Sequence, residues 1–489
     1  MKDRKRVLLI TPPYHSGVVE SAGVWLNVGF VYIAGSLRAA GYDPVIYDAM
    51  SSWHGYEDIE KRITDLKPAV VATTAFTAEI VDALKVLKLA KDINPEIITV
   101  IGNVHPTFCY EEILKEHHSY VDYIVRGEGE ETMVELLDAI FEKGNISKVN
   151  GIVYKDNEEI IVTSPRGFIK DLDSLPMAWD LIAWPIYTYK PMDDSVLAIV
   201  SSSRGCTQQC SFCSQQLFWQ RQWRGRSAEN FVNELEFLRN IYSVNVVMIS
   251  DETPTLSRKR WERILDLKIE RGLDTKLLLE TRVNDILRDE DIMWKYKEAN
   301  VDHIYVGVES TSQMTLDIFK KNIKAEESKR ALDIINEYDI VSETSFVLGM
   351  PDDTKESIRN SVELAKYYAP DLAFFLAIAP WPYSDIYPEL KPYIEVKDYS
   401  KYNLVEPVVK PKKMTLDELR NELGRASREF YMHKLLTLDE MSSSKREFMI
   451  KVIKLIATDS YLAKDMKGSI PEEIKRLLEK ASISTKTKK

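Results

Sequence analysis

Short apolar runs alternate with amphipathic stretches along the first part of the chain. Five of the runs are predicted strands, namely VLLIT (7–11), PVIYDA (44–49), AVVATTA (69–75), IITVIGN (97–103) and YIVRG (123–127). Helix-length segments such as VYIAGSLRAAG (31–41) lie between them. Apolar strands that alternate with amphipathic helices are typical of a parallel sheet covered on both faces. The pattern therefore predicts an α/β domain with a doubly wound parallel sheet over residues 1–145.

A second series of strand-like runs begins at residue 196. It comprises VLAIVSSSRGC, VNVVMISDETP, KLLLETRV, VDHIYVGVES, SETSFVLGMP and PDLAFFLAIAPWP, with an amphipathic stretch between each run and the next. Successive βα units predict a barrel, and we expect a partial (β/α)6 barrel over 196–385, with active groups on the loops after the strands. Residues 146–195 hold a predicted hairpin, GIVYKDNEEIIVT, and a linker interrupted by Pro and Trp. The remainder, 386–489, is predicted to be mostly helical.

The strand ends of the first domain carry polar and glycine-rich turns. Ligands of doubly wound sheets bind at the carboxyl ends of the strands. We therefore expect the ligand-binding loops to lie at the ends of four predicted strands: Thr11–Gly17, Thr73–Thr77, Gly102–Thr107 and Arg126–Glu130.

Composition and charge narrow the classes of function. The chain has 489 residues, of which 45% are hydrophobic and 29% charged, as in ordinary globular proteins. A net charge of −11 gives no basic surface for a nucleic-acid backbone, so no nucleic-acid partner is expected. No apolar run is long enough to span a membrane. The first residues lead directly into a strand without a leader pattern, and we expect a cytoplasmic protein.

Three of the four cysteines, Cys206, Cys210 and Cys213, lie in the stretch GCTQQCSFCSQ, whereas Cys109 is distant. A zinc site usually has four ligands, so a Cys₃His site would need a histidine, and none is near in sequence. A 4Fe-4S cluster held by three thiolates fits better, because it leaves one iron without a protein ligand. That iron could chelate the amino and carboxylate groups of S-adenosylmethionine.

This CxxxCxxC after the first barrel strand resembles the radical S-adenosylmethionine superfamily. Three further motifs occur in the order of that family: SDET (250–253), VGVES (306–310) and FVLGMPDDT (346–354). The resemblance implies that they surround the S-adenosylmethionine, with Glu309 near the ribose. For Glu309 an ion pair with Arg282 at the barrel rim is the alternative. The implied cofactor-binding residues of the barrel are Phe212, Asp251, Glu252, Arg282, Glu309, Gly349 and Pro351.

TPPYHSG, GNVHPTF and VRGEGEE, in the first domain, occur in the order seen in cobalamin-dependent radical enzymes. A lone RGEGE would by default be simple turn chemistry. The domain lacks DxHxxG, which accompanies a lower histidine ligand of cobalt, and we interpret His105 as structuring its loop rather than as a cobalt ligand. The implied cobalamin-binding residues are Thr11, Tyr14, His15, Thr74, Gly102, His105, Gly127, Glu128 and Gly129.

Longer stretches, among them PPYHSGVVESAGVWLNVGF, AWDLIAW and DETPTLSRKR, are similar to the anaerobic magnesium-protoporphyrin IX monomethyl ester cyclase family. The first loop departs from it at Pro13 and Val19. The resemblance implies an oxidative cyclase acting on a tetrapyrrole, with cobalamin, S-adenosylmethionine and a 4Fe-4S cluster, and an electron donor such as flavodoxin or ferredoxin. A methylase that uses methylcobalamin on a lipid or polycyclic substrate stays open.

Two rival classes fit the sequence less well. A non-catalytic corrinoid carrier would need the first domain but none of the barrel motifs, and a methylthiotransferase would need a further three-cysteine domain. The substrate pocket is less defined. Four aromatic residues could line a large flat pocket or pack between the domains: Trp219, Trp223, Trp381 and Tyr383.

Overall fold

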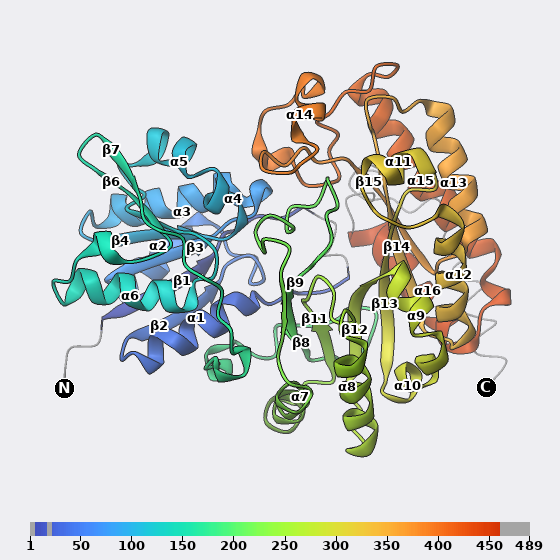
Figure 1. Cartoon of the computed structure of the whole chain (residues 1–489), viewed down its shortest axis with the longest axis horizontal. Coiled ribbons are helices and arrows are strands. Elements are labelled where there is room, and N and C mark those ends of the chain that lie inside the picture. Colours follow the sequence, from blue (N-terminus) through green and yellow to red (C-terminus); the bar gives the residue numbers. More distant parts are fainter. Residues whose placement is uncertain (1–4, 17–21, 460–489) are drawn as a thin grey trace.

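A computed structural model describes residues 5–16 and 22–459, which form two α/β units side by side (Figure 1). The first unit, blue and cyan, contains a seven-stranded sheet of order β2-β1-β3-β4-β5-β6-β7. The predicted residues Gly17 and Val19, and 460–489 of the tail, lie outside the described residues. The strands are β1 (Arg6–Thr11), β2 (Asp43–Asp48), β3 (Val70–Thr74), β4 (Ile98–Gly102), β5 (Tyr123–Val125), β6 (Ile152–Asp156) and β7 (Glu159–Val162).

Helices cover both faces of this sheet, which explains why its strands are apolar throughout. In β1, Val7 and Leu9 pack with α1 and α6, whereas Leu8 and Ile10 pack with α2, α3 and α5 on the other face. The strands from β2 to β5 are parallel, so the predicted doubly wound sheet is confirmed. The helices are α1 (Val28–Ala39), α2 (Tyr56–Leu66), α3 (Ile80–Ile93), α4 (Val104–Phe108), α5 (Tyr110–His117) and α6 (Glu130–Phe141).

The predicted hairpin is β6–β7, and it extends the first sheet at its β5 edge. β6 pairs antiparallel with β5, placing Ile152 opposite Val125, and β7 pairs antiparallel with β6. After β7 the chain leads to the second unit with little regular structure.

The second unit is an open, six-stranded parallel sheet of order β15-β14-β13-β12-β11-β8. All five neighbouring pairs are parallel, and the described residues contain no pairing between β8 and β15 that would close the ring. The predicted partial (β/α)6 barrel is therefore confirmed. Its strands are β8 (Leu197–Val200), β11 (Val246–Ile249), β12 (Lys276–Arg282), β13 (Val301–Glu309), β14 (Val341–Leu348) and β15 (Leu372–Ala377).

Helices cover the outer face of the barrel, and α15 packs against the last strand, β15, and against α13. The Tyr431 hydroxyl of α15 donates to the Ala373 carbonyl at 3.2 Å. The predicted C-terminal helices are therefore part of the barrel wall rather than a separate tail. The helices are α7 (Ala228–Tyr242), α8 (Arg258–Glu270), α9 (Val283–Arg288), α10 (Met293–Glu298), α11 (Gln313–Ile318), α12 (Ala325–Glu337), α13 (Lys355–Tyr368), α15 (Leu416–Leu436) and α16 (Ser443–Asp459).

The segment between β15 and α15 contains the short helix α14 (Tyr387–Leu390) and two 3₁₀ turns, Lys391–Tyr393 and Tyr399–Lys401, among longer irregular stretches, so helix is sparser here than the sequence predicted. In Figure 1 it lies at the top, between the two units. It contacts the strand ends of the first unit, because the Tyr14 hydroxyl donates to the Ser400 carbonyl at 2.9 Å. No helix of the described residues is both long and apolar enough to cross a membrane.

Candidate active site

A cavity of about 680 Å³ lies between the strand ends of the two units. The first unit contributes the carboxyl ends of β1, β3, β4 and β5, and the barrel contributes those of β8 and β11 together with a side chain of β12. The two sheets therefore open onto one shared space. Of the predicted residues it is lined by Thr11, Thr74, Gly102, Gly127, Glu128, Gly129, Asp251 and Glu252.

The first unit presents small residues and one unsatisfied hydroxyl to this cavity. Thr11 Oγ1 is buried and has no hydrogen-bond partner among the described residues. Gly127 has a φ of +74°, a conformation that residues with a Cβ rarely adopt. At Gly129 a Cβ would lie 3.1 Å from Ile33 Cδ1. Glycines and apolar side chains around one free hydroxyl fit a large flat ligand such as a corrin ring.

Three predicted cobalamin-binding residues lie outside the cavity lining. Tyr14 bonds to the segment above the strand ends, and the His15 ring stacks on Trp53 at a centroid distance of 4.0 Å. His105 Nδ1 lies 3.1 Å from Thr77 Oγ1, and burial lowers the pKa of His105 to about 4. The sequence predicted His105 on a loop, but it lies in the short helix α4, where this contact holds it against Thr77.

Glu128 is the centre of a buried ion network between the two units. Its carboxylate, 3% exposed, accepts from Arg204 Nη1 at 2.6 Å and from Arg224 Nη1 at 3.0 Å. Arg204 also pairs with Glu130, and these two carboxylates raise the pKa of Arg204 against the opposing effect of burial. Sequence reasoning missed both arginines, although Arg204 stands two residues before the first clustered cysteine. Glu128 thus lines the cavity and also ties the first unit to the cysteine loop.

The cysteine loop begins at a sharp turn behind the short strand β9 (Ser203–Gly205), which pairs with β10 (Trp223–Gly225). Gly205 has a φ of +87°, and a Cβ there would lie 2.1 Å from the Gln222 carbonyl oxygen. Only glycine fits this turn. The three cysteines are free and half-buried, and burial raises the pKa of Cys213 to about 12.

The thiol groups suit an iron–sulfur cluster better than a single metal ion. Within 5–16 and 22–459, no three His, Cys, Asp or Glu side chains converge where one ion could bind. A tetrahedral zinc ion needs such convergence, whereas the irons of a cubane occupy separate corners and each takes one thiolate. Thiolate is the donor that such clusters use. The Cys206–Cys213 loop therefore fits a cluster with one iron left open.

The two carboxylates of the SDET motif have different surroundings. Asp251 accepts from the Ser202 amide at 2.8 Å and from the hydroxyls of Ser202 and Ser203, so it shapes the chain that leads into the cysteine loop. Glu252 accepts from the Gly205 amide at 3.0 Å and from the Trp219 indole. Burial raises the pKa of both carboxyls. Both line the cavity beside the cysteine loop.

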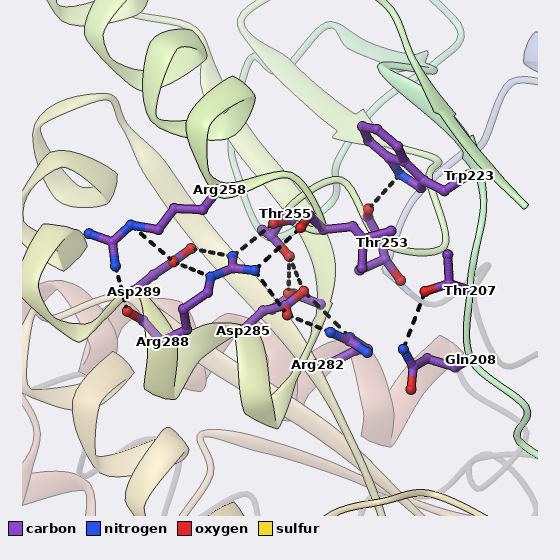
Figure 2. Close-up of polar contacts among 12 residues, drawn as sticks. Thr207, Gln208, Trp223, Thr253, Thr255, Arg258, Arg282, Asp285, Arg288 and Asp289 are labelled. Atoms are coloured by element: carbon purple, nitrogen blue, oxygen red, sulfur yellow. Dashed lines mark hydrogen bonds and ion pairs between the residues drawn. The ribbon is translucent and has the colours of Figure 1, made fainter.

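Glu309 ends β13 in a strained conformation and is paired with a lysine. Its φ is +65°, at a register shift in the pairing with β14. Lys321 Nζ lies 2.7 Å from Glu309 Oε1, and Ser345 donates to the same carboxylate at 3.2 Å. The predicted alternative, an ion pair between Glu309 and Arg282, is wrong, because Arg282 donates to Asp285 at 2.6 Å. Figure 2 shows that pair within a network that also contains Thr255, Arg258, Arg288 and Asp289.

The remaining barrel motifs border the cysteine loop. The Phe212 ring packs on Phe319 at a centroid distance of 4.7 Å. Gly349, with a φ of +88°, donates its amide to Asp353 at 2.8 Å, and Pro351 follows in the same turn. This turn is the glycine–proline feature predicted from the sequence.

The four predicted pocket aromatics divide between the two expected roles. Trp219 lines the cavity. Trp223 donates its indole N–H to the Thr253 carbonyl at 3.2 Å, as Figure 2 shows. Trp381 and Tyr383 pack with Phe108 of the first unit, and the Tyr383 hydroxyl lies 2.9 Å from Thr77 Oγ1.

Glu280 is a cavity residue that sequence reasoning missed. It lies on β12 and is reached by solvent through the cavity, although the barrel wall encloses it. Enclosure, together with the neighbouring carboxylates of Glu343 and Glu252, raises the pKa of Glu280 to about 7. A carboxylate directly after the three leucines of KLLLETRV was the available signal.

Comparisons with known proteins agree with this geometry. The sequence matches the B12 binding domain over residues 14–137 and the Radical SAM superfamily over residues 200–365. It is 38% identical over 438 residues to the anaerobic magnesium-protoporphyrin IX monomethyl ester cyclase of Cereibacter sphaeroides, covering 88% of this chain and 71% of that protein. It is 31% identical over 434 residues to an uncharacterized methyltransferase of Pyrococcus horikoshii, covering 87% of this chain and 92% of that protein.

The fold is that of a solved enzyme with both cofactor types. The radical S-adenosylmethionine methyltransferase TsrM from Kitasatospora setae, with cobalamin and a 4Fe-4S cluster bound, superposes with a TM-score of 0.69. The match covers 93% of this chain and 100% of that one, at 14% identity. The predicted combination of a cobalamin-binding domain and a radical S-adenosylmethionine domain is confirmed. The chain therefore belongs to the radical S-adenosylmethionine enzymes that carry a B12-binding domain, in the family of the anaerobic magnesium-protoporphyrin IX monomethyl ester cyclases.

Proposed function

We propose that this enzyme functionalises an unactivated carbon of a large, mostly apolar small molecule in the cavity between its two units. The observation that carries the proposal is the shared cavity, which the strand ends of a B12-binding domain and of a radical S-adenosylmethionine barrel line together. The substrate and the corrinoid would then lie in this cavity, and the cluster would lie at its edge, where Glu252 and Gln215, two residues after Cys213, line it.

Each side of the cavity has a distinct role in this proposal. Cys206, Cys210 and Cys213 hold a 4Fe-4S cluster, and the Thr11 and Gly127 side holds cobalamin. When bound, the cluster supplies the electron that cleaves S-adenosylmethionine to a 5′-deoxyadenosyl radical, which removes a hydrogen atom from the substrate. Glu252 accepts from the methionyl amino group, and Glu309 accepts a ribose hydroxyl hydrogen bond.

The reaction we favour is cyclase-like oxidation of a tetrapyrrole. The substrate radical would lose one further electron to an acceptor such as the oxidised cluster or the corrinoid, and water would add to the resulting cation with release of a proton. Its support is the 38% identity to a cyclase over most of the chain. The second candidate is methylation of the substrate radical, which the methyltransferase relative at 31% identity supports. In both, the protein excludes bulk water and orients the substrate.

One protein partner follows from the chemistry. The cluster needs a low-potential electron donor, and a flavodoxin or ferredoxin meets that need. Free thiols at a cluster site require a reducing compartment, which favours the cytoplasm. The net charge of −11 gives no reason to propose a nucleic-acid partner.

Anaerobic reconstitution of the full chain with iron, sulfide and hydroxocobalamin tests the proposal. We expect about four irons per chain and one bound corrinoid, and reductive cleavage of S-adenosylmethionine to 5′-deoxyadenosine. With magnesium-protoporphyrin IX monomethyl ester, a product that gains oxygen supports the cyclase, and one that gains a CH₂ unit supports the methylase. A corrinoid-loaded protein that never cleaves S-adenosylmethionine would instead establish a carrier.

A further inference from the structure

Lys321 is a buried cation that neither the barrel motifs nor the family matches explain. It follows α11, and its side chain is 11% exposed, against 9% for its partner Glu309. Their atoms Nζ and Oε1 lie 2.7 Å apart. Burial acts to lower the pKa of Lys321, but Glu309 and Cys210 outweigh burial and raise it, so the ammonium stays charged.

The same ammonium lies beside the cysteine loop. Lys321 Nζ is 5.9 Å from the centroid of the Phe212 ring, and Phe212 stands between the second and third clustered cysteines. The loop is also fastened to the end of α11, because Ser211 donates its amide to Phe319 at 3.0 Å and its hydroxyl to Ile318 at 2.8 Å. The position of Lys321 relative to the cysteines is therefore fixed by the fold.

Gly307 leaves the space that the ion pair fills. A Cβ at this position would lie 2.6 Å from Lys321 Nζ and 2.8 Å from Glu309 Oε1. The glycine of VGVES therefore gives the pair its present position rather than allowing a left-handed backbone. A methyl group here would push the ammonium away while leaving both charges in the protein.

A purely structural ion pair would explain these contacts only in part. Removing the water shell from two charges costs several kcal/mol each, so a buried pair adds little net stability. This pair, in addition, joins two cofactor-binding elements, the Glu309 strand end and the cysteine loop. A buried lysine in that position acts on both cofactors at once.

We propose that Lys321 is a positioning residue that couples the two cofactor sites: it holds Glu309 ready for the ribose of S-adenosylmethionine and places a fixed positive charge beside the cluster. A positive charge stabilises the reduced cluster relative to the oxidised one, and so raises its midpoint potential. The inference rests on the proposed function, because it needs the cluster on the three cysteines.

The test compares four full-length variants after anaerobic reconstitution: Lys321→Met, Lys321→Arg, Gly307→Ala and Lys320→Met. Lys320 is exposed, so its substitution removes the same charge outside the barrel. Iron content, midpoint potential from an EPR-monitored redox titration, and calorimetric affinity for S-adenosylmethionine are measured for each. A wild-type protein without a cluster would refute the proposed function and hence this inference, whereas the following outcomes judge the inference alone.

We expect Lys321→Met to keep its iron, to show a more negative midpoint potential and to bind S-adenosylmethionine roughly tenfold more weakly. Lys321→Arg should restore the potential, and Lys320→Met should match the wild type. Gly307→Ala should shift potential and affinity in the same direction as Lys321→Met but less, and it decides the matter if Lys321→Met fails to fold. Wild-type potential and affinity in the folded Lys321 and Gly307 variants would overturn the proposal.

Discussion

The two sheets that meet at the cavity present different surfaces to it. The first unit offers mainly glycines, threonines and apolar side chains, together with the carboxylates of Glu79, Glu128 and Glu130, whereas the barrel offers mainly polar groups such as Asp251 and Glu252. Both surfaces arise from the same arrangement, parallel strands whose carboxyl ends face one way. The difference shows that the fold selects where a ligand binds and that the loop residues select its chemistry. A flat macrocycle packs on glycines and apolar side chains, whereas a charged sulfonium ligand needs polar partners such as carboxylates.

The largest effect is expected from the removal of one clustered thiol, which should affect the barrel side of the cavity alone. Cys210→Ala should abolish the 4Fe-4S cluster, because a cubane held by two thiolates is poorly retained. Cobalamin binding to the first unit should persist, since the two surfaces are separate. Iron analysis and the visible spectrum after reconstitution measure both.

Cys109→Ala is the matched control for that loss. Cys109 packs among Phe108, Phe218 and Tyr383 and is not part of the three-cysteine loop, so its removal should leave the iron content unchanged. Loss of the cluster in Cys109→Ala would contradict the three-cysteine site.

The second prediction separates the two surfaces by breaking the ion network between them. Arg204→Met leaves Glu128 and Glu130 buried without their shared partner, and removal of one member of a buried pair costs about 3–5 kcal/mol. Urea denaturation should show this loss. The control is Arg38→Met, which breaks the exposed pair with Asp180 and should cost no more than about 1 kcal/mol. Equal losses of unfolding free energy in the two variants would show that the buried network stabilises the protein no more than an exposed ion pair does.

The third prediction concerns the Thr11 hydroxyl on the first unit's side of the cavity. Thr11→Val removes a buried hydroxyl that lacks a partner, so the cofactor-free protein should gain about 1 kcal/mol of stability. If the hydroxyl binds the corrinoid, hydroxocobalamin affinity should fall roughly fivefold. Thr275→Val is the control: its hydroxyl is also buried and unsatisfied, but it precedes β12 at the opposite end of the barrel. Thr275→Val should stabilise without changing affinity, and identical affinities for both variants would exclude Thr11 as a ligand.

The smallest expected effect is the pH dependence of stability that Glu280 causes on the barrel side of the cavity. Because the pKa of Glu280 is raised to about 7, the folded protein binds a proton there that the unfolded chain releases near its ordinary pKa. Its ionisation should therefore lower stability progressively between about pH 4.5 and 7, with the full penalty present above 7. Glu280→Gln should stabilise the cofactor-free protein at pH 8 and have little effect at pH 5. A pH-independent difference between variant and wild type would rule out this titration.

Local patterns in the sequence were sufficient for the elements and for the order of the motifs. The runs VLLIT and VVATT form β1 and β3 because only helices on both faces can bury such continuous apolar strands. The cysteine spacing likewise indicated a cluster loop, since the ligands are close in the chain. His105 was predicted on a loop but lies in helix α4, and its contact with Thr77 involves packing that the pattern does not encode.

Local sequence patterns were sufficient to predict the two α/β units, the three-thiol loop and the family. Which charged side chains pair can be seen only in the tertiary structure. Glu309 pairs with Lys321 rather than with Arg282, and Glu128 pairs with Arg204 and Arg224. Strand and helix periodicities are set by neighbouring residues, and so they can be read along the chain. Ion pairs between residues as distant as Glu128 and Arg204 depend on how the two sheets dock, because side chains that are remote in sequence become neighbours only through packing.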